Sequence, residues 1–208
     1  MKSSLLTALL SVGLALPAAG DGLPDFGLST VTMATPGPVM MRVHPDGSGP
    51  PFTEAFQGSG NRVDATVTLL LLDAMAMPIW NFPAEDIWLQ AQNGGLVPCG
   101  GGAGLIPDRN TDQDGTTVWV APPRAGGHTT GLTLVYVNGT PLISSAGLDL
   151  RFTSPDLDGS GSVTLTDGGL FTQDLFGTYA ERSDLNWDGH INISDVGVMA
   201  GAMGQGCP

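Results

Sequence analysis

Short runs in which hydrophobic and polar residues alternate dominate the chain from residue 28 to residue 152. The clearest run is 63–71, where the odd positions, such as Val67 and Leu69, are hydrophobic and the early even positions are polar. Similar alternation occurs in 87–91, 117–120 and 148–152. Successive side chains of a strand point to opposite faces of a sheet, so each run predicts a strand with one buried face.

Turn-forming residues separate these runs. Asp114-Gly115, Asn138-Gly139 and the glycine-rich stretch 99–104 lie between them, and the chain contains 31 glycines and 16 prolines. No helical period interrupts the pattern before residue 153. Several short strands at such spacing predict a mainly β fold, a β-sandwich, for residues 21–153.

Two turns in this region carry a family resemblance. The strand beginning at Ala65 leads to Asp73, four residues intervene before Pro78, and a later turn reads Thr-Asp-Gln-Asp-Gly-Thr-Thr at 111–117. This arrangement resembles bacterial immunoglobulin-like domains of the invasin and adhesin kind. The resemblance implies an immunoglobulin-like β-sandwich with a role in surface attachment.

The pattern changes at Thr153-Ser154-Pro155, where alternation stops and acidic segments begin. We place a domain boundary there and expect a second, small α-helical domain at 154–208. The connection is so short that the two domains should touch.

The second domain contains a duplicated acidic loop. Residues 156–167 and 184–195 each carry oxygen-bearing side chains at loop positions 1, 3, 5, 9 and 12 and glycine at position 6. Calcium prefers six to eight oxygen ligands, and a twelve-residue loop of this spacing can wrap it, with position 7 contributing its backbone carbonyl. Each loop should lead into a helix, and Val163 and Ile191 at position 8 should bury against each other.

This double motif resembles dockerin domains, whose duplicated EF-hand-like loop-helix repeats use Asp at position 12. The resemblance covers about fifty residues. It implies two calcium sites, the first with the ligands Asp156, Asp158, Ser160, Ser162, Thr164 and Asp167, the second with Asp184, Asn186, Asp188, His190, Asn192 and Asp195. It also implies that loop positions 10 and 11 contact a partner, a cohesin-like domain in dockerins; here these positions are Leu165, Thr166, Ile193 and Ser194.

The two loops differ in charge. Ser160 stands where the second loop has Asp188, and Thr164 stands where it has Asn192. We expect the second site to bind calcium more strongly; the first loop either binds it weakly or merely keeps its fold. Several glycines lower the helix propensity of the following segments, so calcium should help to order them.

The N-terminus has the features of a secretory leader. Lys2 precedes an apolar run from Leu5 to Leu16, and the small residues up to Gly20 would allow cleavage. This predicts a leader at 1–20 and a secreted or cell-surface protein that does not insert into a membrane once the leader is removed; an uncleaved anchor is the alternative. In an oxidising compartment, Cys99 and Cys207 would pair within the chain, stay free or link two chains.

The net charge of −13 disfavours nucleic acid as a partner and favours divalent cations. No nucleophile elbow, phosphate-binding loop or zinc motif occurs, so we do not expect an enzyme. We therefore predict a non-catalytic calcium-binding protein that serves extracellular assembly or attachment through a cohesin-like partner or self-association.

Two tryptophans suggest an alternative function. Strand parity places Trp88 and Trp119 on outward faces, where aromatic rings can stack on sugars. The chain would then be a carbohydrate-binding module that its dockerin delivers to a complex, with a polysaccharide as ligand. Alternatively, the two rings pack against the second domain, a loop or another subunit.

Overall fold

The computed structural model describes residues 22–208, apart from the side chains of 102–104; the expected leader lies outside the described residues. The described part is mainly β, with two short helices that both follow the last strand. The strands are β1 (Thr30–Met33), β2 (Val39–Arg42), β3 (Ala55–Gln57), β4 (Asn61–Val63), β5 (Val67–Leu70), β6 (Ile87–Ala91), β7 (Leu96–Pro98), β8 (Thr116–Trp119), β9 (Ala125–Gly127), β10 (Thr133–Val137), β11 (Thr140–Pro141) and β12 (Leu150–Thr153); the helices are α1 (Leu165–Phe176) and α2 (Ile193–Ala202).

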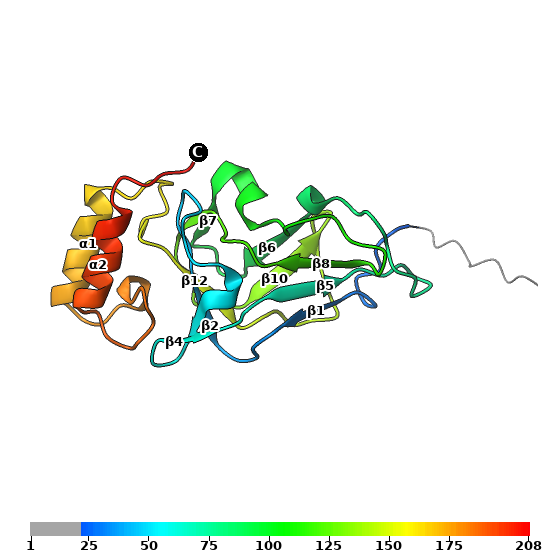
Figure 1. The fold of residues 1–208 in the computed structure, drawn as a ribbon, viewed down its shortest axis with the longest axis horizontal. Helices are drawn as coiled ribbons and strands as arrows, with labels where there is room; N and C mark the ends of the chain where they lie inside the picture. Colours follow the sequence, from blue (N-terminus) through cyan, green and yellow to red (C-terminus); the bar gives the residue numbers. More distant parts are fainter. Residues whose placement is uncertain (1–21) are drawn as a thin grey trace, which may run out of the picture.

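The strands form four small sheets. Their orders are β1-β5-β8, β11-β10-β6, β12-β2-β3-β4 and β7-β9. All neighbouring pairs are antiparallel except β12 and β2, which run parallel. We call the part of the chain that contains β1 to β12, residues 30–153, the β body. In Figure 1 the two helices lie together at one end of this β body.

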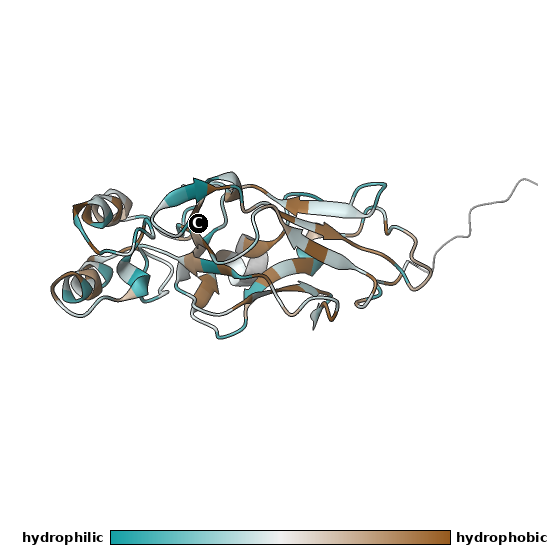
Figure 2. Cartoon of the chain, turned by 90° about the horizontal axis from the view of Figure 1, so that it is seen from below, coloured by the Kyte–Doolittle hydropathy of each residue, from teal (hydrophilic) through white to brown (hydrophobic). Residues whose placement is uncertain are grey.

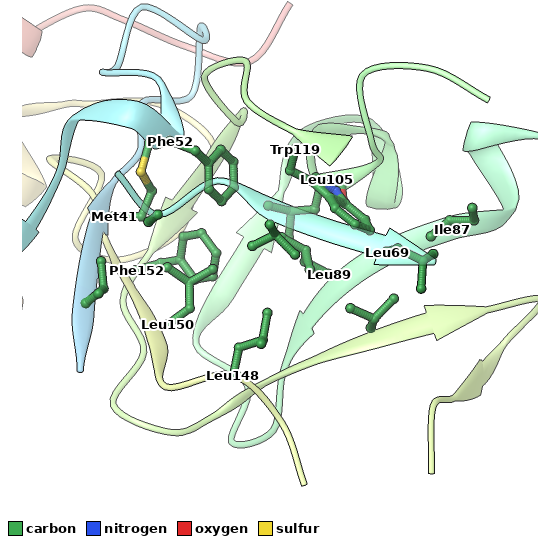
Figure 3. Packing of buried hydrophobic residues seen from close by; sticks show 14 of the residues in the cluster. Met41, Phe52, Leu69, Ile87, Leu89, Leu105, Trp119, Leu148, Leu150 and Phe152 are labelled. Carbon is green, nitrogen blue, oxygen red and sulfur yellow. The ribbon is translucent and has the colours of Figure 1, made fainter. Parts of the chain in front are cut away.

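One hydrophobic core lies inside the β body. It combines side chains from several sheets, including Leu69 of β5, Leu89 of β6 and Phe152 of β12, all fully buried. Figure 3 shows these side chains pointing toward one another together with Phe52 and Trp119. Along the strands, hydrophobic segments alternate with polar ones (Figure 2). Burying one large apolar side chain stabilises a fold by about 1.5–3 kcal/mol, so this core holds the sheets together.

In three of the alternating runs, 87–91, 148–152 and 63–71, the buried residues fall at alternate positions, as the hydrophobic pattern predicted. Residues 87–91 form β6 with its odd positions buried, and Leu148, Leu150 and Phe152 are buried around β12. In the run 63–71 the odd positions from Ala65 to Leu71 are also buried. That run is divided, however, between β4 and β5, which belong to different sheets.

The outward placement predicted for Trp119 is wrong. In β8 the buried residues are Thr117 and Trp119, and Trp119 is 1% exposed. The polar Thr117 can point inward because its hydroxyl donates a 2.6 Å hydrogen bond to the Arg109 carbonyl. The indole nitrogen of Trp119 likewise donates to the Leu105 carbonyl at 2.8 Å. Because both polar groups have hydrogen-bond partners, Thr117 and Trp119 can lie on the buried face of β8, opposite to the face that hydropathy alone predicted.

A second, smaller core lies between the two helices. Phe171 of α1, Met199 of α2, Leu157 and Leu185 belong to it, together with Val163. The half-buried Ile191 packs against the same cluster. The backbone of Val163 also pairs with the C-terminal tail: its amide donates to the Gln205 carbonyl, and its carbonyl accepts from the Gly204 amide. No helix in the described part of the chain is long and apolar enough to cross a membrane.

The C-terminal segment is joined to the β body by several contacts. Cys99 and Cys207 form a disulfide across 108 residues of sequence. The hydroxyl of Thr153, the last residue of β12, donates to the Arg182 carbonyl, and Arg42 of β2 donates to the Leu185 carbonyl at 3.3 Å. The expectation that the regions on either side of residue 153 touch therefore agrees with these contacts.

Candidate calcium-binding loops

Loop 156–167 begins three residues after the last residue of β12, Thr153, and the first residue of the loop organises it. Asp156 is fully buried, and its two carboxylate oxygens accept hydrogen bonds from the backbone amides of Ser160, at 3.0 Å, and Gly161, at 2.8 Å. Gly161 has a φ of 87°, a conformation that favours glycine. These bonds curl the chain around one carboxylate, as a calcium loop requires.

The last loop residue closes the structure. Asp167 is buried, and its oxygens accept from the amides of Asp158, at 3.1 Å, and Thr164, at 2.8 Å. Thr164 caps the N-terminus of α1 and forms a capping box with Asp167. The acidic residue at position 12 thus fixes both the loop and the start of the helix. The hydroxyl of Thr164 takes part in the cap, so a water-mediated contact suits this ninth position.

Three carboxylates converge in this loop. Asp156, Asp158 and Asp167 each place one oxygen within 4.8 Å of the other two. Burial raises the pKa of Asp156, and repulsion from Asp167 raises it further, while backbone amides act in the opposite direction. The Ser160 hydroxyl bonds to the Ser162 carbonyl at 3.2 Å, so these oxygens also lie together. An all-oxygen donor set of this kind suits a hard cation such as calcium.

Loop 184–195 repeats the same plan before α2. Asp184 is buried and accepts from the amides of Asp188, at 3.1 Å, and Gly189, at 2.9 Å. Asp195 accepts from the amides of Leu185, at 2.8 Å, and Asn192, at 2.9 Å. Burial raises the pKa of Asp184, and the charge of Asp195 adds to this effect.

The backbones of the two loops match at two positions. Position 6 has a φ of 87° in Gly161 and 88° in Gly189, and position 4 has a φ of 68° in Gly159 and 53° in Trp187. A left-handed tryptophan is uncommon, so the second loop accepts backbone strain to keep the shared geometry. The duplicated sequence therefore forms a duplicated structure.

The interiors of the two loops differ. In the second loop the amide groups of Asn186 and Asn192 donate to one oxygen of Asp188, at 3.0 and 3.3 Å. In addition, the Tyr179 hydroxyl donates to Asp184 at 2.8 Å. Among the described residues, only the first loop holds a cluster of three carboxylates, so the stronger binding expected of the second loop stays a prediction.

Both loops pack directly on the β body. The amide of Gly127 in β9 donates to the Asp156 carbonyl at 2.6 Å, and a Cβ added at Gly126 would lie 1.8 Å from an Asp156 carboxylate oxygen. The amide of Gly60, in the turn between β3 and β4, donates to the Trp187 carbonyl at 2.9 Å. A Cβ at Gly60 would lie 3.2 Å from the Cβ of Asp188. Sequence reasoning missed these glycines because their role depends on contacts far along the chain.

The four residues at loop positions 10 and 11 are exposed. Leu165 is 85% exposed and Ile193 is 80% exposed, and Thr166 and Ser194 beside them are also accessible. Each pair begins a helix at the same place in its repeat. Two large apolar side chains are therefore left in solvent at equivalent positions, and the β body does not cover them.

An ion pair between the buried Asp174 and the half-buried Arg182 fixes the segment between the two repeats. Asp174 of α1 accepts two hydrogen bonds from Arg182, at 2.7 and 2.9 Å, and one from the Ser183 hydroxyl at 2.7 Å. The hydrogen bond from Arg182 lowers the pKa of Asp174 below its usual value. The pair therefore positions Ser183 immediately before Asp184, the first residue of the second loop.

Replacing Asp174 with Asn is expected to lower the free energy of unfolding by about 2 kcal/mol at pH 7, because three bonds to a charged group are weakened. The depressed pKa means that this stabilisation is present above the pKa of the unfolded state and is lost as pH falls through the folded-state pKa. Urea unfolding of wild type and Asp174→Asn from pH 7 to pH 2 measures the difference in their free energies of unfolding. The difference should shrink toward zero at the acidic end; a constant difference would show that the charge does not matter.

The two tryptophans do not form a common platform. Trp88 in β6 is half-buried and stacks on Tyr136 of β10, with ring centroids 5.6 Å apart and planes 11° apart. Trp119 lies in the core. A sugar platform that needs both rings exposed is thus ruled out by the burial of Trp119.

Comparison with known proteins identified no relative: no family model, no curated protein and no solved structure matches the chain.

Proposed function

We propose that this chain is a secreted, non-catalytic calcium-binding protein that serves extracellular or cell-surface assembly. In this proposal residues 154–208 form a dockerin-like module with two EF-hand-like calcium loops. Residues 21–153 form an immunoglobulin-like β-sandwich. The observation that carries the proposal is the duplicated loop, in which the first and last aspartates are buried and bonded by backbone amides in the same way.

Calcium is the cation that this donor set favours. The side-chain ligands in the proposal are carboxylate, amide or hydroxyl oxygens. Position 7 of each loop contributes a backbone carbonyl oxygen, so every proposed ligand atom is oxygen. Buried carboxylates are costly without a compensating charge, and the raised pKa values of Asp156 and Asp184 express that cost. Binding of calcium would offset it and order the helices that follow.

Docking is proposed to occur through Leu165, Thr166, Ile193 and Ser194. Apolar patches rimmed by polar residues are typical of surfaces that bind another protein, and in this proposal Leu165 and Ile193 are the apolar members of such a patch. The partner is a cohesin-like domain or a second copy of this chain. The acidic charge of the chain disfavours nucleic acid as the partner.

Calorimetric titration of the mature chain with calcium, followed by circular dichroism, tests the metal sites. We expect two binding events and a gain of helix. Asp156→Asn should remove one event and Asp184→Asn the other, so that each variant reports the affinity of the remaining site. The expected order is tighter binding in Asp156→Asn, which retains the second loop. Absence of binding at millimolar calcium would overturn the proposal.

A pair of variants tests the docking surface. Leu165→Asp with Ile193→Asp should abolish calcium-dependent self-association in analytical ultracentrifugation, or binding to a panel of cohesin-like domains. Phe176→Asp is the matched control, because Phe176 is 84% exposed on the same helix α1 but lies outside the proposed surface. Equal effects of both changes would argue against a specific docking surface.

A further inference from the structure

Strand β6 has a free edge. It lies at the end of its sheet, and within residues 22–208 its sole partner strand is β10. The amide of Gln92 donates to the Leu132 carbonyl, and that of Asn138 donates to the Asp86 carbonyl. Hydrogen-bonded and non-hydrogen-bonded pairs alternate in an antiparallel ladder, so the even positions of β6 bond to β10. The amide and carbonyl groups of Leu89 and Ala91 therefore point away from β10.

A groove of about 660 Å³ follows this edge. One wall is β6 from Trp88 to Ala91, continued by Gln92, and Glu85 lies before that strand. The opposite wall comes from β7 and the 3-10 segment Cys99–Leu105. Most of the residues that line the groove are apolar or glycine: Trp88, Leu89, Ala91, Gly94, Leu96, Pro98, Gly101, Leu105 and Ile106.

The opposite wall is anchored at both ends. Cys99 is held by the disulfide to Cys207, and its amide donates to the Arg124 carbonyl at 3.0 Å. At the other end the Leu105 carbonyl accepts from the indole of Trp119. A groove between a strand edge and a wall tied down in this way is preformed for an occupant.

The chemistry of the groove fits an extended peptide better than a sugar. Backbone groups at Leu89 and Ala91 repeat every two residues, about 7 Å apart, and another extended backbone repeats at that spacing. A sugar needs many polar side chains, but the indole nitrogen of Trp88 already donates to Gln90 at 3.2 Å and one face of its ring is covered by Tyr136. Exposed Glu85 and the net charge of −13 favour a basic end on the peptide.

We infer that the groove beside β6 binds an extended peptide strand of a partner protein, which adds to the sheet at Leu89 and Ala91. The strand carries apolar side chains toward the Leu96 and Leu105 wall and a basic residue near Glu85. This mode of recognition uses backbone bonds for affinity and side-chain pockets for specificity. It is separate from the docking surface of the calcium loops.

A fluorescent peptide with two lysines followed by three Val-Thr pairs tests the inference by anisotropy. We expect saturable binding to the full chain. Ala91→Pro removes one edge amide without touching a ladder bond to β10 and should weaken binding at least tenfold. The control is Val118→Pro, in edge strand β8 of another sheet. Hydrogen exchange adds a readout: in the free protein the Leu89 and Ala91 amides should exchange faster than those of Trp88 and Gln90, and peptide should slow them.

A second measurement uses only wild-type protein and so does not depend on the folding of a variant. N-methylation of the peptide at successive positions should abolish binding with a two-residue period, because alternate amides face β6. Loss of binding without such a period would overturn the inference, as would absence of peptide binding. Binding of cellohexaose or xylohexaose that Trp88→Ala abolishes and Ala91→Pro leaves unchanged, with no competition from peptide, would assign the groove to a glycan instead.

Discussion

Gly126→Ala is expected to weaken calcium binding at the first loop at least tenfold and to lower the free energy of unfolding by about 2–3 kcal/mol. Gly126 lies in β9 outside the left-handed region, so alanine suits its backbone conformation. The added methyl group would, however, lie 1.8 Å from a carboxylate oxygen of Asp156, and one of the two must move. Calcium calorimetry and urea unfolding measure the two effects.

A glycine in α1 provides the matched control. A Cβ at Gly169 would meet nothing within 4 Å, and alanine is the better helix former. Gly169→Ala should therefore raise the free energy of unfolding by about 1 kcal/mol and leave both calcium affinities unchanged. If Gly126→Ala bound calcium like wild type, the β body would not position the first loop.

Cys207→Ser is expected to lower the free energy of unfolding by about 4 kcal/mol, because the disulfide closes a loop of roughly a hundred residues in the unfolded chain. The same bond holds the C-terminal tail, which pairs through Gln205 and Gly204 with Val163 at position 8 of the first loop. The variant should therefore also bind calcium more weakly at that loop. Guanidinium unfolding and calcium calorimetry check both expectations.

Reduction provides the control for this effect. Dithiothreitol should destabilise the wild type to the level of Cys207→Ser. It should have no effect on a variant in which both Cys99 and Cys207 are serine. A double variant as stable as wild type would mean that the disulfide contributes nothing to the free energy of unfolding.

Local patterns predicted much of the fold. The alternation in 87–91 and 148–152 identified buried faces correctly because only apolar side chains are buried within those two runs. The duplicated loop was recognisable because its turns depend on residues within twelve positions of one another. Its helices begin at capping residues, Thr164 and Asn192, that the sequence displays directly.

What the sequence could not reveal depends on distant contacts. The inward face of Trp119 is set by the carbonyl of Leu105, and hydropathy does not register such a hydrogen bond. The break between β4 and β5 follows from Asp64, whose carboxylate accepts from the amide of Thr66 at 2.8 Å. In the sequence, Gly60 and Gly126 resemble ordinary turn and strand glycines. Only the folded chain shows that Asp188 and Asp156 of the two loops occupy the space that a side chain at these positions would need. Pairing of Cys99 with Cys207 likewise required the folded chain.

The parallel pairing of β2 with β12 has a mechanical consequence. Residues 39–42 lie beside residues 150–153 in the same direction, and the proposed docking surface follows β12 in the sequence. Tension between the N-terminal region and that surface would pull β2 from its first residue and β12 from its last. Such a load shears the ladder, so its hydrogen bonds resist together instead of opening one at a time. A protein that holds an extracellular assembly under strain would gain from this arrangement.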